Sequence, residues 1–443
     1  MTKTTRRGFL GMAGAAIAAP AAAEARPALR IAVMSDNQLH FEDNDWGWAT
    51  LDKALRQIAP MGVDLVLNAG DISDNDSPPV VAKYLERCRA ALGDDVEHFA
   101  CPGNHDVWLG KDHGSRTRDD AIRDFYALFG CGGRRIQRRT IAGYDFVAVA
   151  SNEKGPYFAE DEAELAATLD ACRARNAKKP IFVLTHYQPA RSVFGSVDMY
   201  GETLRRVFDM YPQVFSLSGH THCPLQNERM IWQKGFTAVN TSTTSYGCYP
   251  GRVVNTVGGI LPFARESLGF MVMDLFDGRI EIRRYSVDDM CEMTPPSRRW
   301  ELHWPFDPAR PEYGEDRRAA VPRFPAGDKL LIRYDYGFVH FLFDSAVGAD
   351  GVESYRLSIA PADAAGGDAR DWFYVSDYYR LGAKRGGRVS LRAPANSLEP
   401  GRAYRISVYP RSWFAQEGAP LSHVFAINPN YRFRNVDETY PQE

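Results

Sequence analysis

Two histidines one residue apart, His220 and His222, follow the apolar run Val214–Ser218 in the segment Gly219-His220-Thr221-His222. Side chains alternate along extended backbone, so both imidazoles can point to the same side of the chain. Gly219 would let the backbone approach another group closely. The pair suits metal binding, but two histidines in an ordinary polar loop would look the same.

Four further polar clusters also come at the ends of apolar runs. They are Asp36-Asn37-Gln38, Gly70-Asp71-Ile72-Ser73-Asp74, Gly103-Asn104-His105-Asp106 and Thr185-His186-Tyr187. Their oxygen and nitrogen donors suit Mn²⁺, Zn²⁺ or iron. Two divalent cations about 3.5–4 Å apart form the clamp that phosphoryl transfer uses. Asp71 is the natural bridging carboxylate, and Asn104 offers an oxygen ligand without added negative charge.

The elements that must position these clusters are buried strands followed by helices. Strands are predicted at 29–35, 63–68, 96–100, 144–150, 181–184, 214–217 and 236–239, with a hairpin over 270–285. Helices are predicted at 46–59, 78–92, 118–129, 160–175 and 202–210. In an open α/β sheet, ligands bind outside the carboxyl ends of the strands. The polar clusters are therefore expected to meet in one crevice.

The order and identity of the five clusters resemble the calcineurin-like metallophosphoesterases over about residues 29–287. The resemblance implies an α/β fold in which a β-sheet sandwich is flanked by helices. It also implies a dinuclear enzyme that hydrolyses phosphomonoesters or phosphodiesters. In such enzymes a metal-bound hydroxide attacks phosphorus in line.

The resemblance also implies a role for each site residue. The first metal would be held by Asp36, Gln38, Asp71 and His222, and the second by Asp71, Asn104, His186 and His220. His105 would face the substrate and protonate the leaving group. Asp74 would orient His105.

Position 38 departs from the usual pattern of the family, because Asp-x-His is replaced by Asp36-Asn37-Gln38. Some members carry Gln there, and His40 is an alternative ligand. Four residues could touch substrate or simply pack in loops: Asn152, Tyr187, Arg191 and Tyr246. The remaining histidines are read as solvated or structural: His113, His98, His303, His340 and His423.

Two rival functions stay open. One is a low-turnover protein that binds metal and phosphate on the same fold, and the other is an interaction protein that relies on the C-terminal part. The net charge of −3 shows no basic excess that would indicate nucleic acid. The expected partner is a small phosphoester substrate, and the oligomeric state stays open.

The N-terminus has the pattern of an export signal. Thr5-Arg6-Arg7-Gly8-Phe9-Leu10 is a twin-arginine motif, and a short stretch rich in alanine and glycine leads to Ala21-Ala22-Ala23. A membrane anchor is the alternative, but the stretch is short for a bilayer span. We expect cleavage after residue 23 and a periplasmic or secreted protein with no stable membrane span.

The 443 residues exceed what one hydrophobic core usually spans. We predict a signal peptide at 1–23, a phosphoesterase domain at 24–294, a linker at 295–324 and a smaller all-β sandwich domain at 325–443. Short aromatic strands separated by Gly, Pro and Asp support the last assignment. A disulfide among Cys223, Cys248 and Cys291 is left open.

Overall fold

The computed structural model describes residues 26–430, apart from 43–45, 111–113, 152–158, 197, 252, 294–298, 336 and 364–367. The export signal, Asn152 and His113 therefore lie outside the described residues. No helix in the described part has both the length and the apolar character that crossing a bilayer requires. The seven cysteines are all free thiols, so the disulfide left open by the sequence is not formed.

The first sheet combines parallel and antiparallel pairing. Its order is β12-β11-β10-β1-β2-β3, and β13 also pairs with β11. The strands are β1 (Leu29–Met34), β2 (Leu65–Asn68), β3 (Glu97–Ala100), β10 (Gly269–Phe276), β11 (Arg279–Ser286), β12 (Cys291–Glu292) and β13 (Trp300–His303). The three strands β1, β2 and β3 are parallel, as βαβ units require. Strand β13 falls in the segment predicted as a linker.

The second sheet has the order β4-β5-β6-β7-β9-β8. Its strands are β4 (Ile136–Ile141), β5 (Tyr144–Val149), β6 (Ile181–Thr185), β7 (Val214–Ser218), β8 (Ile231–Gln233) and β9 (Thr237–Asn240). The four central strands are parallel, and β4 and β8 form antiparallel edges. Because the parallel strands are buried, their sequences are nearly continuous apolar runs.

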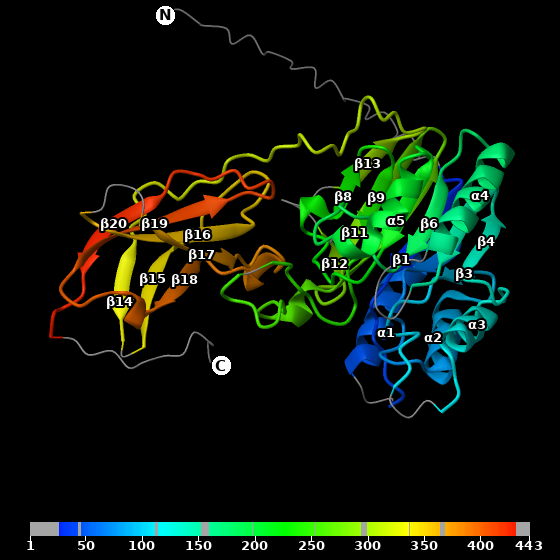
Figure 1. Ribbon diagram of the computed structural model, residues 1–443, viewed down its shortest axis with the longest axis horizontal. Helices are drawn as coiled ribbons and strands as arrows, with labels where there is room; N and C mark the ends of the chain where they lie inside the picture. The colour runs from blue at the N-terminus through cyan, green and yellow to red at the C-terminus, as the bar shows by residue number, and fades with distance from the viewer. Residues whose placement is uncertain are drawn as a thin grey trace, which may run out of the picture.

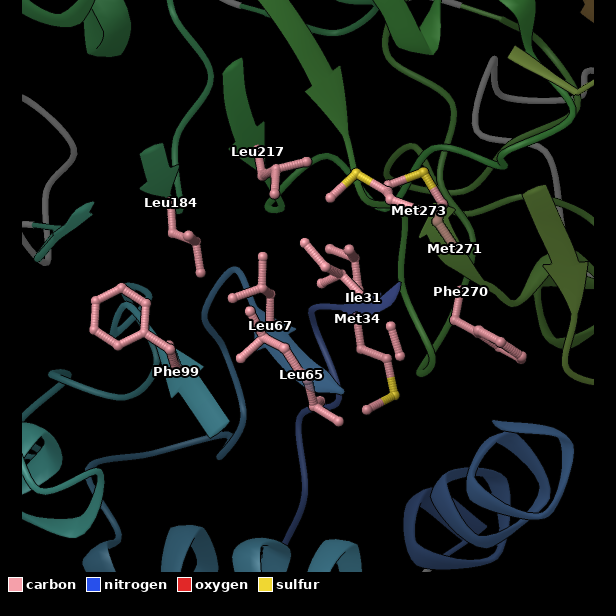
Figure 2. Packing of buried hydrophobic residues seen from close by; sticks show 14 of the residues in the cluster. Ile31, Met34, Leu65, Leu67, Phe99, Leu184, Leu217, Phe270, Met271 and Met273 are labelled. Atoms are coloured by element: carbon pink, nitrogen blue, oxygen red, sulfur yellow. The ribbon is translucent and has the colours of Figure 1, made fainter. Parts of the chain in front are cut away.

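The two sheets pack face to face around one apolar core. Ile31, Leu67 and Met273 of the first sheet share this core with Leu184 and Leu217 of the second (Figure 2). Outside the first sheet lie α1 (Trp46–Ile58), α2 (Pro78–Leu92) and α3 (Arg118–Leu128), and outside the second lie α4 (Ala159–Arg175) and α5 (Asp198–Phe208). This is the expected sheet sandwich flanked by helices.

Helix ends follow local chemistry. Helix α2 begins with Pro78-Pro79, which the first turn tolerates because its N–H groups have no intrahelical partner. Helix α3 begins with a capping box, in which Thr117 accepts from the backbone of Asp120 and the Asp120 carboxylate accepts from the backbone of Thr117. Short 3₁₀ helices are η1 (Ala59–Met61), η2 (Glu228–Met230), η3 (Ala264–Ser267), η4 (Gly382–Lys384) and η5 (Ala395–Ser397).

The C-terminal region is all-β, as expected. One sheet contains β14 (Leu331–Tyr334), β15 (Phe338–Asp344) and β18 (Arg388–Pro394). The other contains β17 (Arg370–Val375), β16 (Ser354–Pro361), β19 (Ala403–Arg411) and β20 (Leu421–Ala426). Both sheets contribute to one apolar cluster, and they form a lobe beside the N-terminal sheets (Figure 1). We refer to residues 322–427 as the C-terminal β-region.

Candidate metal centre

The strands of each sheet end level with one another. In the first sheet Met34 of β1 pairs with Asn68 of β2, and Asn68 pairs with Ala100 of β3. In the second sheet Thr185 of β6 pairs with Ser218 of β7, which pairs with Asn240 of β9. Every polar cluster follows one of these strand ends. The loops that carry them therefore start from one edge of the sandwich.

Three of the predicted ligands meet at this edge. Atoms of Asp36, Asp71 and His186 that could bind a metal all lie within 4.8 Å of one another, and the three residues are buried. His186 Nε2 is 3.1 Å from Asp71 Oδ2 and 4.0 Å from Asp36 Oδ1. Two carboxylates and an imidazole at this spacing can share a divalent cation.

The two histidines after β7 complete the cluster. His222 Nε2 lies 3.1 Å from Asp36 Oδ1. The backbone N–H of His220 donates to the same carboxylate at 3.0 Å, and its ring lies edge-on to His186 with centroids 5.2 Å apart. The side chain of Tyr187 packs on His220, with centroids 4.3 Å apart. Tyr187 thus supports a candidate ligand and is itself buried.

Backbone carbonyls set the orientation of two rings. His186 Nδ1 lies 2.9 Å from the carbonyl oxygen of Ala69, and His222 Nδ1 lies 2.9 Å from that of Tyr246. A carbonyl can only accept, so each Nδ1 carries the proton. Each Nε2 is then the ring atom that faces the carboxylates. Metal-bound histidines in proteins are held in this way by a second group.

The buried atom Asn104 Oδ1 has no hydrogen-bond partner, and Asn104 was a predicted ligand of the second metal. His186 Nε2, another predicted ligand of that metal, faces the carboxylates of Asp71 and Asp36. A buried polar atom without a partner costs roughly 1–3 kcal/mol. A divalent cation would satisfy both atoms together. The residues present therefore fit the metals that the fold implies.

The backbone at the site is strained. Eleven non-glycine residues have positive φ among the described residues, and five of them are predicted ligands: Asp36, Gln38, Asp71, His220 and His222. Each such residue costs about 1–3 kcal/mol, and such strain clusters at functional sites. Backbone strain at the positions of candidate ligands is typical of a functional site and not of core packing.

Two glycines make room for the carboxylates. A Cβ atom on Gly103 would lie 2.0 Å from Asp71 Oδ1, and one on Gly219 would lie 2.4 Å from Asp36 Oδ2. Neither position could hold a larger residue without moving a candidate ligand. Glycine is required at positions 103 and 219 because the carboxylates of Asp71 and Asp36 approach the backbone closely there.

The ionisable groups of the cluster shift one another's pKa values. Burial opposes ionisation of Asp71, but the charges of His186 and His105 outweigh it, and the pKa of Asp71 is lowered. Burial disfavours the charged form of His186, yet Asp71 and Asp36 raise its pKa. Burial and then the neighbouring His186 lower the pKa of His220 to about 4. His220 is therefore neutral at pH 7, the form that binds metals.

His105 lies at the open side of the cluster, with 24% of its side chain exposed. Its backbone N–H donates to Asp71 Oδ1 at 2.9 Å. Its Nδ1 lies 2.8 Å from the carbonyl oxygen of Asp74 and 3.3 Å from the carboxylate of Asp74. The indole of Trp108 stands edge-on to its ring, with centroids 5.6 Å apart, and is 45% exposed.

Gln38 and His40 lie in different surroundings. Gln38 is buried, and its Oε1 accepts a hydrogen bond from Ser245 Oγ at 3.0 Å. The side chain of His40 is 53% exposed, and its Nε2 lies 3.7 Å from Asp74 Oδ2. His40 thus faces the Asp74 and His105 pair, while Gln38 lies next to the loop that holds His222.

The other histidines form separate contacts. His303 pairs with Glu312, and His340 Nε2 lies 3.1 Å from Asp335 Oδ2. Burial lowers the pKa of His98 to about 4. His423 lies in β20. Arg191 was a candidate for substrate contact, and its Nη1 bonds Glu202 Oε1 at 2.5 Å.

Sequence reasoning missed residues that hold the ligand loops. Asp106 is buried and accepts hydrogen bonds from the backbone N–H groups of Ser73 and Gly103, both at 2.9 Å. Thr243 Oγ1 donates to the carbonyl oxygen of Asp36 at 2.9 Å. The available signals were a carboxylate inside the Gly103–Asp106 motif and the polar run after β9.

Comparison with known proteins matches residues 29–224 to the calcineurin-like phosphoesterase family, and this part of the chain has the metallophosphoesterase fold. No curated protein sequence matches the chain. The solved structure of a dimetal phosphatase from Danio rerio is 12% identical, covers 63% of this chain and 99% of its own, and has a TM-score of 0.42.

A purple acid phosphatase from yellow lupin (Lupinus luteus) seeds is 13% identical, covers 62% of this chain and 55% of its own, and has a TM-score of 0.45. At these identities and TM-scores, neither similarity supports an argument about this chain. The family match and the site geometry therefore carry the assignment of the fold and of the candidate centre.

Proposed function

We propose that this protein is a dinuclear metal-dependent phosphoesterase that hydrolyses phosphomonoesters or phosphodiesters. One observation supports the proposal more strongly than the others. Asn104 Oδ1 is buried without a hydrogen-bond partner beside the group of Asp36, Asp71 and His186, in which the imidazole faces both carboxylates. A fold that bound no cation would leave this cost uncompensated.

The proposed ligands follow from the cluster. Asp36, Gln38, Asp71 and His222 would hold the first metal, and Asp71, Asn104, His186 and His220 the second. When bound, two divalent cations would neutralise phosphoryl charge and activate the attacking water. The donor set lacks thiolates and suits Mn²⁺, Zn²⁺ or iron.

His105 is the proposed acid. Its Nδ1 is turned towards Asp74, so Nε2 is the ring atom that can give a proton to the leaving oxygen. Asp74 is then a positioning residue, since its carbonyl and carboxylate fix the imidazole. A leaving group protonated by His105 would lie near the exposed indole of Trp108.

A substrate panel tests the proposed function. The protein would be loaded with Mn²⁺, Zn²⁺ or iron and offered phosphomonoesters, cyclic nucleotides, glycerophosphodiesters and nucleotide pyrophosphates. We expect metal-dependent turnover of at least one class and its loss on chelation. Two bound metals without turnover of any class would favour the low-turnover binding protein instead.

Export by the twin-arginine route is also proposed, from the motif Arg6-Arg7 and the alanine-rich stretch that follows. Replacing both arginines by lysine should leave the protein uncleaved inside the cell. Fractionation with detection of the mature N-terminus measures this, and normal processing of the variant would contradict the proposal.

A further inference from the structure

The loop between β9 and β10, residues 241–268, contacts three of the four proposed ligands of the first metal. We call it the site loop. Ser245 Oγ donates to Gln38 Oε1 at 3.0 Å, and Thr243 Oγ1 donates to the carbonyl oxygen of Asp36 at 2.9 Å. The carbonyl oxygen of Tyr246 accepts from His222 Nδ1 at 2.9 Å. The contact with Tyr246 leaves His222 Nε2 for the metal, and the other two contacts hold the side chain of Gln38 and the backbone of Asp36.

The second metal's ligands are held by other elements. His186 Nδ1 bonds the carbonyl oxygen of Ala69, and Asp71 Oδ1 accepts from the backbone of His105. Both supports belong to the loops that follow β2 and β3. A displacement of the site loop would therefore act on the first metal and leave the second in place.

The far side of the site loop is bound to the C-terminal β-region. The backbone N–H of Val254 donates to the carbonyl oxygen of Phe373 at 2.8 Å. The side chain of Asn255 pairs with the backbone of Val375 through two hydrogen bonds, of 2.8 and 2.9 Å. Figure 1 shows this loop between the two lobes. The loop thus adds to the edge of β17.

Buried side chains also contribute to the contact between the site loop and the C-terminal β-region. Tyr249 and Leu261 of the loop share an apolar cluster with Val375, Tyr379 and Trp413. The hydroxyl of Tyr249 donates to Glu353 Oε1 at 3.1 Å. Glu353 also pairs with Arg229, whose guanidinium lies 3.7 Å from the ring centroid of Phe194.

Backbone hydrogen bonds link segments of the site loop to one another between its two ends. Gly247 bonds Ala264 and Leu261 through backbone groups at 2.9 and 3.0 Å, and Tyr249 N–H donates to the carbonyl oxygen of Gly259 at 2.8 Å. A Cβ on Gly247 would lie 1.8 Å from Ser267 Oγ. Close packing of this kind transmits displacement instead of absorbing it.

We infer that the C-terminal β-region is a structural part of the first metal site, because it holds the site loop where the loop orients Gln38 and His222. The inference rests on the proposed two-metal function and goes beyond it. It gives the C-terminal β-region a role in metal affinity through the site loop.

The test uses two conservative changes to the anchor, Tyr249→Phe and Asn255→Ala, in the full-length chain. Tyr249→Phe removes the hydroxyl that donates to Glu353, and Asn255→Ala removes both hydrogen bonds to the backbone of Val375. Mn²⁺ titration of the metal-free protein, followed by spin resonance, measures the two sites separately. Loss of a group that hydrogen-bonds a metal-binding side chain typically weakens metal binding by about 10–100-fold. We expect a loss of at least tenfold in the double variant at the first site and unchanged affinity at the second.

Matched controls are Tyr211→Phe and Asn176→Ala. Tyr211 donates to the carbonyl oxygen of Ala166, and Asn176 accepts from the backbone of Lys178, both remote from the site loop along the fold. Both controls should leave the two affinities unaltered. Hydrogen exchange over residues 241–268 should rise in the anchor variants and stay unchanged in the controls.

Three results would overturn the inference. The first is unchanged first-site affinity in a double variant whose site loop exchanges faster. The second is an equal loss at both sites, which would indicate general destabilisation. The third is an unmodified protein that binds fewer than two Mn²⁺, which would overturn the proposed function as well. If the unmodified protein binds two Mn²⁺ and the anchor variants bind both with the same affinities, the inference is contradicted and the proposed function is not.

Discussion

Single residues at the centre have different roles that substitution can separate. Asp36, Asp71 and His186 converge on one point, while His105 stands at the open side against Asp74. The first three are expected to bind metal, and His105 is expected to act on the substrate. Metal content and turnover should therefore respond to different substitutions.

His105→Ala should keep both metals and lose turnover, by about 10²–10⁴-fold, because general acid catalysis typically contributes that much. The loss should be smaller for p-nitrophenyl esters, whose leaving group needs no proton. Steady-state kinetics with leaving groups of graded pKa, alongside metal analysis, measures this. An equal loss for every leaving group would assign His105 to phosphate binding instead.

Gln38 and His40 can be distinguished at the first metal. Gln38 is buried beside Ser245, whereas His40 is half exposed and faces Asp74. An amide oxygen is a weaker, harder donor than imidazole, so the first site should be the weaker one and favour Mn²⁺. Gln38→His should tighten Zn²⁺ at this site, and His40→Ala should leave occupancy unaltered. Metal loss in His40→Ala with none in Gln38→Ala would reverse the assignment.

At the scale of elements, the loops after β2 and β3 are tied together by Asp106. Its carboxylate accepts from the backbone N–H groups of Ser73 and Gly103, one from each loop. Asp106→Asn would turn an NH₂ group towards one of these donors. We expect a loss of about 1–3 kcal/mol in the free energy of unfolding, the cost of an unsatisfied buried group. Denaturant titration measures it.

The control for Asp106→Asn is Asp119→Asn in the first turn of α3, where 84% of the carboxylate side chain is exposed. Its effect should stay within about 0.5 kcal/mol, as for most surface substitutions. Equal effects of the two substitutions would show that Asp106 does not join the loops.

The sequence predicted most elements that carry the site, since buried parallel strands are continuous apolar runs ending in polar clusters. It missed β4 (Ile136–Ile141) and β8 (Ile231–Gln233), which lie at sheet edges. Strand β4 reads IQRRTI, and its charged exposed face hides the pattern. The motifs predicted which residue types bind metal. The hydrogen bonds that Ser245 and Tyr246 make to Gln38 and His222 could not be predicted, because they depend on the conformation of a long loop.

At the scale of the whole molecule, the two lobes are joined by more than the connecting segment. Glu353 of the C-terminal β-region pairs with Arg229 and accepts from Tyr249. Burial lowers the pKa of Arg229, which means that burial disfavours its charge. The carboxylate of Glu353 is paired with this guanidinium. The contact between lobes thus contains a charged pair that is sensitive to the loss of either partner.

Glu353→Ala should lower the free energy of unfolding by about 3–5 kcal/mol, because it leaves Arg229 uncompensated. The control is Glu315→Ala, whose partner Lys234 has a side chain that is 60% exposed. That surface pair should contribute at most about 1 kcal/mol. Denaturant unfolding compares the two, and equal small losses would mean that the contact between lobes is not held by this pair.

The most direct test of the proposed centre is the metal content of the folded protein and of two variants, Asp71→Ala and Asn104→Ala. After equilibration with Mn²⁺ and removal of free metal, the unmodified chain should hold two ions. Asp71→Ala should lose both, because Asp71 is the proposed bridge, and Asn104→Ala should lose the second. Circular dichroism should show both variants folded. Folded variants that keep two ions and full activity would contradict the assignment.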